Sequence, residues 1–259
     1  MKFFLSIILT THNRPNLLSR AIQSLRKQSF SNFEIILCAD ESEEKTKIIA
    51  QKMLMSQDTF LSNPNLKGPA DTRNIGLNLA SGDWICFLDD DDTFDCDFFE
   101  KSLDKITNHE KVYFFNYSKV FEDRTNEDIV QLSVEDVHMN SPNTDHLLVQ
   151  NFIPNNTLFV PKYMAKNFEF DRNLSSHEDW DWILSLKYNN VSFEHVPLLG
   201  PKIHISNIES RNNFNNKQID LSLDYLYIYR KWPSNKEHLK QERCKVLQNF
   251  GITVPSEYL

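Results

Sequence analysis

The most informative part of the sequence is Trp84-Ile-Cys-Phe-Leu-Asp-Asp-Asp-Asp92, where an apolar run leads directly into four carboxylates. A short apolar run preceded by the turn residues Ser81-Gly-Asp83 predicts a strand that is covered on both faces of a sheet. Strand side chains alternate, so we expect Asp89 and Asp91 to point the same way. Their mutual repulsion would be offset by Mg²⁺ or Mn²⁺, which prefers carboxylate oxygens and bridges to phosphates. The alternative is a solvated acidic turn or a helix start, where Asp is favoured anyway.

Strand and helix patterns alternate around this segment. Phe3–Leu9 and Phe33–Ala39 are further β-rich apolar runs. Helical spacing of apolar residues predicts helices over Pro15–Leu25, Lys45–Met55 and Arg73–Ala80. The alternation predicts an α/β fold with a mostly parallel, doubly wound sheet, whose ligands bind beyond the carboxyl ends of the strands.

The pattern changes after about residue 110. The polar stretch Glu122–Asp128 predicts a hairpin or loop, and a helix is expected over Asp179–Lys187. Further strands are expected over Val112–Tyr117, Leu158–Val160 and Val191–Val196. The chain from Asp220 onward has a helical pattern that is interrupted at Pro233. We therefore expect a smaller second region and a helical C-terminal tail beside the parallel sheet.

The charge balance and the cysteines exclude several classes of protein. The chain has 259 residues and a net charge of -8, which argues against nucleic acid as the main partner. Its four cysteines lack metal-ligand spacing and predict reduced thiols in a cytoplasmic protein. The start, Met1–Leu9, has no small-residue cleavage site after it, so a buried strand is expected rather than a signal peptide. No apolar run in the sequence has the length of a membrane span.

Three motifs, in order, resemble family 2 glycosyltransferases with the GT-A fold. They are Ser6-Ile-Ile-Leu-Thr-Thr-His-Asn-Arg-Pro15, Gly68-Pro-Ala-Asp-Thr-Arg-Asn-Ile-Gly76 and Ala80-Ser-Gly-Asp-Trp-Ile-Cys-Phe-Leu-Asp-Asp-Asp-Asp92. Together they lie within the N-terminal part of the chain, before the change of pattern. Two positions depart from the family pattern: His12 stands where Tyr is usual, and Thr10 where Pro is usual. Both lie near the base-binding pocket that the resemblance implies.

The resemblance implies a nucleotide-sugar site at the carboxyl ends of the first strands. The residues implied in donor binding are Thr11, Asn13, Arg14, Asp40, Arg73, Asp89 and Asp90. A carboxylate at a strand end, such as Asp40, can accept from a nucleobase N–H or a ribose hydroxyl, although a helix N-cap would also explain it. A guanidinium such as that of Arg73 matches phosphate oxygens, and a surface ion pair is the alternative. The implied metal ligands are Asp91 first and Asp89 second, with His204 completing the sphere of Mn²⁺ or Mg²⁺, unless His204 is an ordinary strand residue.

A second acidic motif, Ser176-His-Glu-Asp-Trp-Asp-Trp182, resembles the Glu-Asp motif of the same family. The resemblance implies that Asp179 is the general base of an inverting displacement, with Glu178 orienting it or the acceptor. The alternative is the acidity that is common at helix N-termini. Trp180 and Trp182 fit either sugar stacking or buried packing. Arg211, in the Asn-rich segment 207–216, is expected to cover the diphosphate if that segment closes as a lid.

The function that follows from the resemblance is transfer of a sugar from a nucleoside-diphosphate sugar, UDP-linked by preference, to a hydroxyl of a surface glycan. Capsule, lipopolysaccharide and other polysaccharides fit as acceptors. Residues 1–110 would bind the donor, 111–205 the acceptor and the base, and 206–259 would form a mobile segment and helical tail. The tail would contact the inner face of a membrane, pack on the catalytic region or form a dimer. A non-catalytic sugar-nucleotide-binding subunit is the alternative, and a sugar-phosphate nucleotidyltransferase is disfavoured because the chain has only 5 Gly.

Overall fold

The computed structural model describes residues 4–40, 43–66, 68–125, 128–139, 142–174, 176–206 and 221–259. Arg211 and the Asn-rich segment 207–216 lie outside these residues, so the expectation of a lid stays a prediction.

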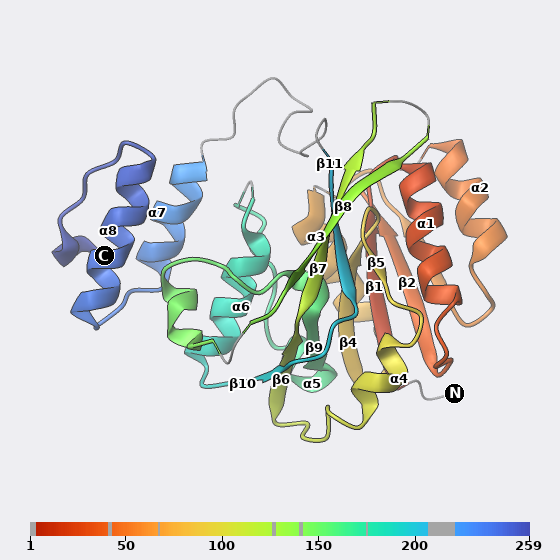
Figure 1. Ribbon diagram of the computed structural model, residues 1–259, viewed down its shortest axis with the longest axis horizontal. Helices are drawn as coiled ribbons and strands as arrows, with labels where there is room; N and C mark the ends of the chain where they lie inside the picture. The colour runs from red at the N-terminus through yellow and green to blue at the C-terminus, as the bar shows by residue number, and fades with distance from the viewer. Residues whose placement is uncertain are drawn as a thin grey trace.

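The central sheet has the mostly parallel arrangement that the alternating pattern predicts. In the described part of the chain, seven strands lie in the order β10-β6-β9-β4-β1-β2-β3 (Figure 1). Only β9 among them runs antiparallel to its neighbours. The strands are β1 (Leu5–Thr11), β2 (Phe33–Ala39), β3 (Thr59–Ser62), β4 (Trp84–Asp89), β6 (Lys111–Phe115), β9 (Leu158–Pro161) and β10 (Ser192–Val196). Every residue of β1 and β2 is buried, as expected of strands that are covered on both faces.

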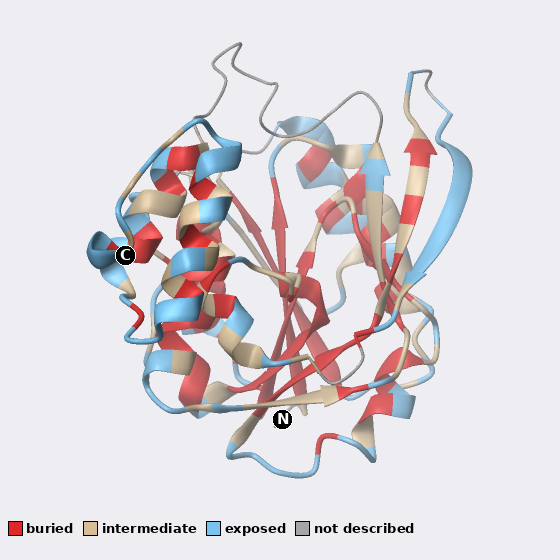
Figure 2. Ribbon diagram, turned by 60° about the vertical axis from the view of Figure 1, so that its left-hand side comes forward, coloured by how far each residue is buried: buried red, intermediate tan, exposed pale blue. Residues whose placement is uncertain are grey.

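Helices cover both faces of this sheet. On one face, α1 (Pro15–Arg26), α2 (Glu44–Met53) and α4 (Phe98–Leu103) pack against it. On the other, α3 (Gly68–Leu79), α5 (Lys162–Ala165), α6 (Glu178–Tyr188), α7 (Leu221–Lys231) and α8 (Glu237–Asn249) contribute to a second cluster. Figure 2 shows the buried strands running through the middle of the molecule between these layers. Short 3₁₀ turns complete the elements: η1 (Thr144–Leu148), η2 (Asn155–Thr157) and η4 (Ser256–Tyr258).

A second, four-stranded sheet stands beside the acidic turn and was not expected from the sequence. Its order is β5-β11-β7-β8, formed by β5 (Thr93–Phe94), β7 (Tyr117–Asp123), β8 (Val130–Val137) and β11 (Pro201–Ser206). The chain passes from β6 of the main sheet into β7 at Asn116, whose buried side chain accepts from the backbone N–H of Met139 at 2.8 Å. Asp89 ends β4 of the first sheet, and Asp90, Asp91 and Asp92 connect it to β5 of the second. The acidic turn is therefore held from both sheets.

The C-terminal helices are part of the main core. Ile228 and Tyr229 of α7 and Leu247 of α8 are fully buried in the same cluster as Phe87 of β4. Of the contacts that were expected for the C-terminal tail, packing on the rest of the chain is therefore observed. The division of the chain at residues 110 and 205 stays a prediction. No helix within the described ranges is both long enough and apolar enough to span a membrane.

Candidate active site

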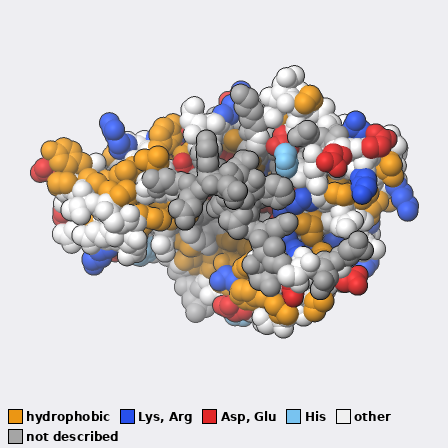
Figure 3. Space-filling model, turned by 90° about the horizontal axis from the view of Figure 1, so that it is seen from above, with side chains coloured by type: hydrophobic (Ala, Val, Ile, Leu, Met, Phe, Trp, Pro, Cys, Tyr) orange, Lys and Arg blue, Asp and Glu red, His pale blue; other side chains and the backbone are white. Residues whose placement is uncertain are grey.

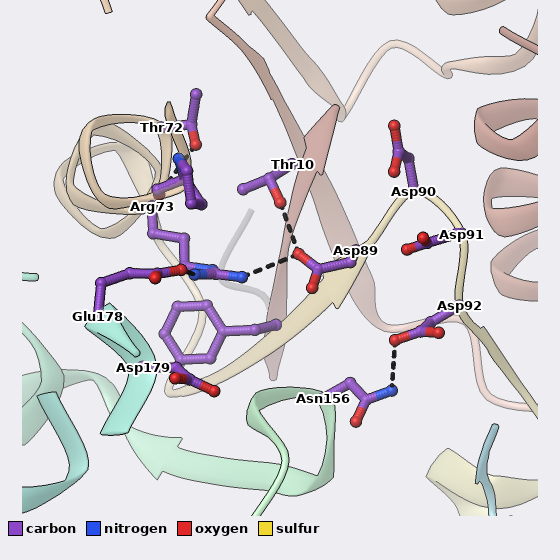
Figure 4. Close-up of polar contacts among 12 residues, drawn as sticks. Thr10, Thr72, Arg73, Asp89, Asp90, Asp91, Asp92, Asn156, Glu178 and Asp179 are labelled. Carbon is purple, nitrogen blue, oxygen red and sulfur yellow. Dashed lines mark hydrogen bonds and ion pairs between the residues drawn. The ribbon is translucent and has the colours of Figure 1, made fainter. Parts of the chain in front are cut away.

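The acidic turn closes tightly at the carboxyl end of β4. Asp89 lies opposite Thr10 of β1, and the Thr10 hydroxyl donates to Asp89 Oδ1 at 2.8 Å (Figure 4). The backbone N–H of Asp92 donates to the carbonyl of Asp89 at 3.0 Å, which closes the turn. Thr10 departs from the usual Pro of the resembling motif, and its hydroxyl gives Asp89 a partner that Pro has no group to supply.

The fold sorts the four carboxylates into two kinds. The side chains of Asp89 and Asp91 are 28% and 23% exposed. Asp90 is fully buried, and Asp92 is nearly so, with Asn156 Nδ2 donating to Asp92 Oδ2 at 3.0 Å. These two partly exposed carboxylates are the pair expected from strand alternation, and of the four they are the two that a ligand can reach.

Asp90 is bound within the protein. Its carboxylate accepts from the Thr11 hydroxyl at 2.7 Å and from Nε and Nη2 of Arg14. Arg14 also donates to Asp91 Oδ2 at 2.8 Å. Burial disfavours the charged guanidinium, but the two carboxylates outweigh it and raise the pKa of Arg14. The sequence prediction placed Thr11, Arg14 and Asp90 in donor binding; their contacts here shape the acidic turn, and the buried Asp90 has no surface for a ligand.

Arg73 joins the acidic turn to the start of α6. Its Nη2 donates to Asp89 Oδ1 at 2.9 Å, and its Nη1 pairs with Glu178. The guanidinium carbon also lies 5.6 Å from the centre of the Phe170 ring. Burial opposes the charge, but the neighbouring carboxylates prevail and raise the pKa of Arg73. Arg73 was predicted near a diphosphate, and the structure adds that it bridges two candidate catalytic segments.

Asp179 lies in the first turn of α6, next to this bridge (Figure 4). Its Oδ1 accepts from the backbone N–H of Trp180 at 2.7 Å, and its Oδ2 accepts from Asn151 Nδ2 at 3.4 Å. Burial and the adjacent Glu178 carboxylate raise the pKa of Asp179 to about 6. A carboxylate with a raised pKa is a stronger proton acceptor, and Asp179 therefore has the chemistry of a general base.

His204 does not reach the exposed aspartates. Its Nδ1 is 2.6 Å from Glu122 Oε1 and its Nε2 is 2.8 Å from the Thr93 hydroxyl. Burial lowers the pKa of His204 to about 4, and Glu122 has a lowered pKa, so a neutral ring donates from Nδ1 to a carboxylate and accepts at Nε2. Its backbone N–H donates to Asp92 at 2.9 Å. The predicted metal ligand therefore stands behind the turn, and ligation would require the ring to leave both partners.

The side chains of the acidic turn supply only part of the ligands that a divalent cation needs. Among the described residues, no group of three His, Cys, Asp or Glu side chains is placed to hold a metal ion. Of the four aspartates in the turn, Asp89 and Asp91 supply the accessible carboxylates. That number suits an ion that keeps its waters and takes its remaining ligands from substrate phosphates.

Asp40 and Asn13 lie at the ends of β2 and β1. Asp40 Oδ1 is 2.8 Å from Nδ1 of the exposed His12. The Asn13 side chain, at a left-handed residue with φ of 47°, accepts from the backbone N–H of Glu43 at 2.7 Å. His12, which replaces the usual Tyr, is therefore paired with the carboxylate that was predicted to bind the nucleoside.

Trp180 and Trp182 pack in the core, which decides between the two interpretations of the motif. Both are fully buried, with Trp180 Nε1 donating to the carbonyl of Leu147 at 2.7 Å. The Trp182 ring stacks on Phe170 with centroids 4.9 Å apart. Neither indole offers a face to a sugar.

Several partners were missed by the sequence prediction. Arg20 donates from Nη1 to Glu122 and from Nη2 to the carbonyl of Asp91, each at 2.6 Å. Asn151 and Asn156 approach Asp179 and Asp92 from the segment before β9. For Asn156, a signal was present in the unusual polarity of Asn155-Asn-Thr157 just before an apolar strand. The pairing of these residues with partners far away in the sequence could not have been predicted.

A comparison with protein families assigns the chain. The model of glycosyl transferase family 2 matches residues 6–173, which include the three N-terminal motifs and the acidic turn. The chain belongs to glycosyl transferase family 2. The motif that contains Glu178 and Asp179 follows the matched region.

Curated relatives share parts of this glycosyltransferase sequence. An uncharacterized glycosyltransferase of Haemophilus influenzae is 30% identical over 184 residues, which are 70% of this chain and 61% of the relative. The GalNAc(5)-diNAcBac-PP-undecaprenol beta-1,3-glucosyltransferase of Campylobacter jejuni is 42% identical over 34% of this chain and 29% of its own length. The UDP-Glc:alpha-D-GlcNAc-diphosphoundecaprenol beta-1,3-glucosyltransferase WfgD of Escherichia coli is 37% identical over 35% of this chain and 36% of its own. The matches thus span less than two thirds of these relatives.

Among solved structures, S. aureus TarS 1-349 in complex with UDP-GlcNAc superimposes with a TM-score of 0.71 at 20% identity. The match covers 97% of this chain and 74% of that TarS 1-349 chain. This likeness confirms the predicted GT-A fold.

Proposed function

We propose that this family 2 glycosyltransferase moves a sugar from a UDP-sugar to a hydroxyl of a lipid-linked glycan, with inversion at the anomeric carbon. The observation that carries the proposal is the Arg73 bridge. It holds the exposed carboxylate of Asp89 and the first turn of α6, with its raised-pKa Asp179, on either side of one guanidinium. Leaving-group stabilisation and proton acceptance are the two tasks of such a displacement, and each side is suited to one.

On the donor side, Asp91 and Asp89 would hold Mn²⁺ or Mg²⁺ together with the diphosphate. Such an ion would supply the positive charge that a departing diphosphate requires. Arg73 lies against Asp89, and its guanidinium can add to the positive charge that stabilises the departing diphosphate. Asp40 and His12 at the neighbouring strand ends would contact the nucleoside.

On the acceptor side, Asp179 would take the proton of the attacking hydroxyl. Glu178 is paired with Arg73 and therefore remains a fixed charge beside it. That charge and burial keep the pKa of Asp179 high enough for it to accept a proton, yet low enough for it to be ionised at neutral pH.

The substrate classes follow from the relatives. Two of them are named as glucosyltransferases that act on diphosphoundecaprenol-linked sugars, and one of these names UDP-Glc as donor. TarS was solved with UDP-GlcNAc. We therefore propose UDP-glucose or UDP-N-acetylglucosamine as donor and a polyprenyl-diphosphate-linked sugar as acceptor, which is an intermediate of surface polysaccharide synthesis.

The test measures UDP release from a panel of UDP-hexoses with Mn²⁺ and a synthetic polyprenyl-diphosphate sugar, and proton NMR of the new linkage reports inversion. Asp179→Asn should keep UDP affinity and lose transfer. Asp91→Ala should lose the thermal stabilisation by UDP that depends on Mn²⁺. Asp97→Asn is the matched control, because it removes a half-exposed carboxylate paired with Lys101 away from the turn. Release from no donor would refute the proposal, as would transfer by Asp179→Asn.

A lipid-linked acceptor requires the enzyme to work at a membrane surface. The outer side of α7 carries the exposed Leu223 and Arg230, whose spacing places them on one stripe of the helix. Figure 3 shows hydrophobic side chains gathered over the C-terminal helices. We propose that this stripe contacts the cytoplasmic membrane face. Flotation with anionic vesicles should be reduced in Leu223→Ser, and equal flotation of the variant would exclude the contact.

A further inference from the structure

The N-terminus of α6 has no local cap. Its N-cap residue, His177, makes no side-chain hydrogen bond to the first turn and has a left-handed backbone with φ of 59°. A histidine in that conformation is uncommon and persists where the surroundings impose it. The turn that carries Asp179 therefore needs support from another part of the chain.

The support comes from α7, through Asp224. The carboxylate Oδ2 of this buried residue accepts from the Ser176 backbone N–H at 2.8 Å and from the Ser176 hydroxyl at 2.9 Å. Because that hydroxyl gives its proton to Asp224, it accepts from Nδ1 of His177, which is 2.7 Å away. Asp224 thus fixes both residues that precede Glu178.

Residues at the C-terminal end of α7 contact the other side of the turn. Trp232, directly after α7, donates from Nε1 to Asp181 Oδ1 at 2.7 Å, and Lys231 Nζ lies 2.9 Å from Asp181 Oδ2. Asp181 is 1% exposed. The residues on both sides of Glu178 and Asp179 are therefore held by one C-terminal helix, although this helix lies outside the region that the family model matches.

We propose that Asp224 is a positioning residue for transfer: it acts through Ser176 and His177 to set the direction of the Asp179 carboxylate. This inference rests on the proposed role of Asp179 as base. It makes the C-terminal helices part of the catalytic module, because the general base is placed by α7 rather than by its own helix. Proton transfer depends steeply on such placement.

The experiment compares Asp224→Ala and Asp224→Asn with Tyr227→Phe. The control removes another α7 contact, the hydroxyl that donates to Asp171 at 2.7 Å, without touching the α6 entry. We expect Asp224→Ala to lower kcat on the order of tenfold or more with UDP affinity unchanged. Asp224→Asn, which keeps an oxygen for Ser176, should recover part of that loss, and Tyr227→Phe should behave as the wild type.

Hydrogen–deuterium exchange of the peptide that contains Ser176–Asp181 gives a readout independent of turnover. It should speed up in Asp224→Ala and stay unchanged in Tyr227→Phe. Unchanged exchange, a parallel loss of UDP affinity, or an equal fall of kcat in the control would overturn the positioning role. If Asp224→Ala does not fold, Asp224→Asn and Ser176→Ala decide by the same comparisons. A wild type that releases no UDP would refute the proposed function, and the exchange data would still test the contact.

Discussion

The dependence of transfer on pH gives the sharpest test of the base. The pKa of Asp179 is about 6, raised by burial first and by the Glu178 charge second. Only the ionised carboxylate accepts a proton, so kcat should be half maximal near pH 6 and about one tenth of its plateau near pH 5. The rate rises with pH, because the group must lose its proton to act.

Glu178→Gln separates the two causes. The amide oxygen can still accept from Arg73, but the negative charge beside Asp179 is gone. The midpoint of the acidic limb should therefore move to lower pH. Because burial is the larger cause and remains, it should move only part of the way towards the ordinary 3.8.

The assay is kcat at saturating UDP-glucose between pH 4 and 8, with UDP affinity measured at each pH to remove effects on binding. Asp97→Asn should leave the profile unchanged, and Asp179→Asn should be inactive throughout. A wild-type midpoint near pH 4, or a midpoint that stays in place in Glu178→Gln, would refute the reasoning.

Three further outcomes follow from the same contacts. Between about pH 4 and 6 the folded chain keeps a proton on Asp179 that the unfolded chain has released, so the stability of the fold falls as pH rises through this window. Asp179→Asn should therefore raise Tm at pH 8. An unchanged Tm would contradict the raised pKa of Asp179. Arg73→Met leaves the Glu178 carboxylate without its buried partner and should cost about 3–5 kcal/mol in urea unfolding. Trp182→Ala should cost about 3–5 kcal/mol with UDP affinity unchanged, whereas loss of affinity without loss of stability would restore the sugar-stacking hypothesis.

The sequence predicted the elements whose signal is local. The strand over Phe33–Ala39 has the bounds that were expected, and the strand from Trp84 ends one residue later than expected, at Asp89. Helix α6 begins at Glu178, within one residue of the expectation. Dense apolar runs and helical spacing carry enough information for such segments, because burial of each face depends on the residues of the segment itself.

The second sheet could not be predicted in this way. Strand β8, Val130–Val137, alternates apolar and polar residues from Val130 to Glu135, which is a local strand signal. However, these residues are all exposed, so the alternation does not mark a face that packs on a core, and it does not show which strands β8 joins. Similarly, Arg73 and Glu178 are 105 residues apart in sequence and meet only in the folded chain. The types of the site residues were visible in the motifs, whereas the sorting of the four aspartates into buried and exposed pairs depends on these long-range partners.

The reversed strand β9 has a consequence for folding during synthesis. β9 lies between β4 and β6, so β4 has a bare edge until Leu158–Pro161 have left the ribosome. β4 contributes Trp84–Leu88, all buried in the finished protein, and a bare apolar edge is a template for pairing with other chains. The nascent N-terminal half therefore depends on prompt arrival of β9, and a chain that stops before it should aggregate rather than persist as a smaller folded domain.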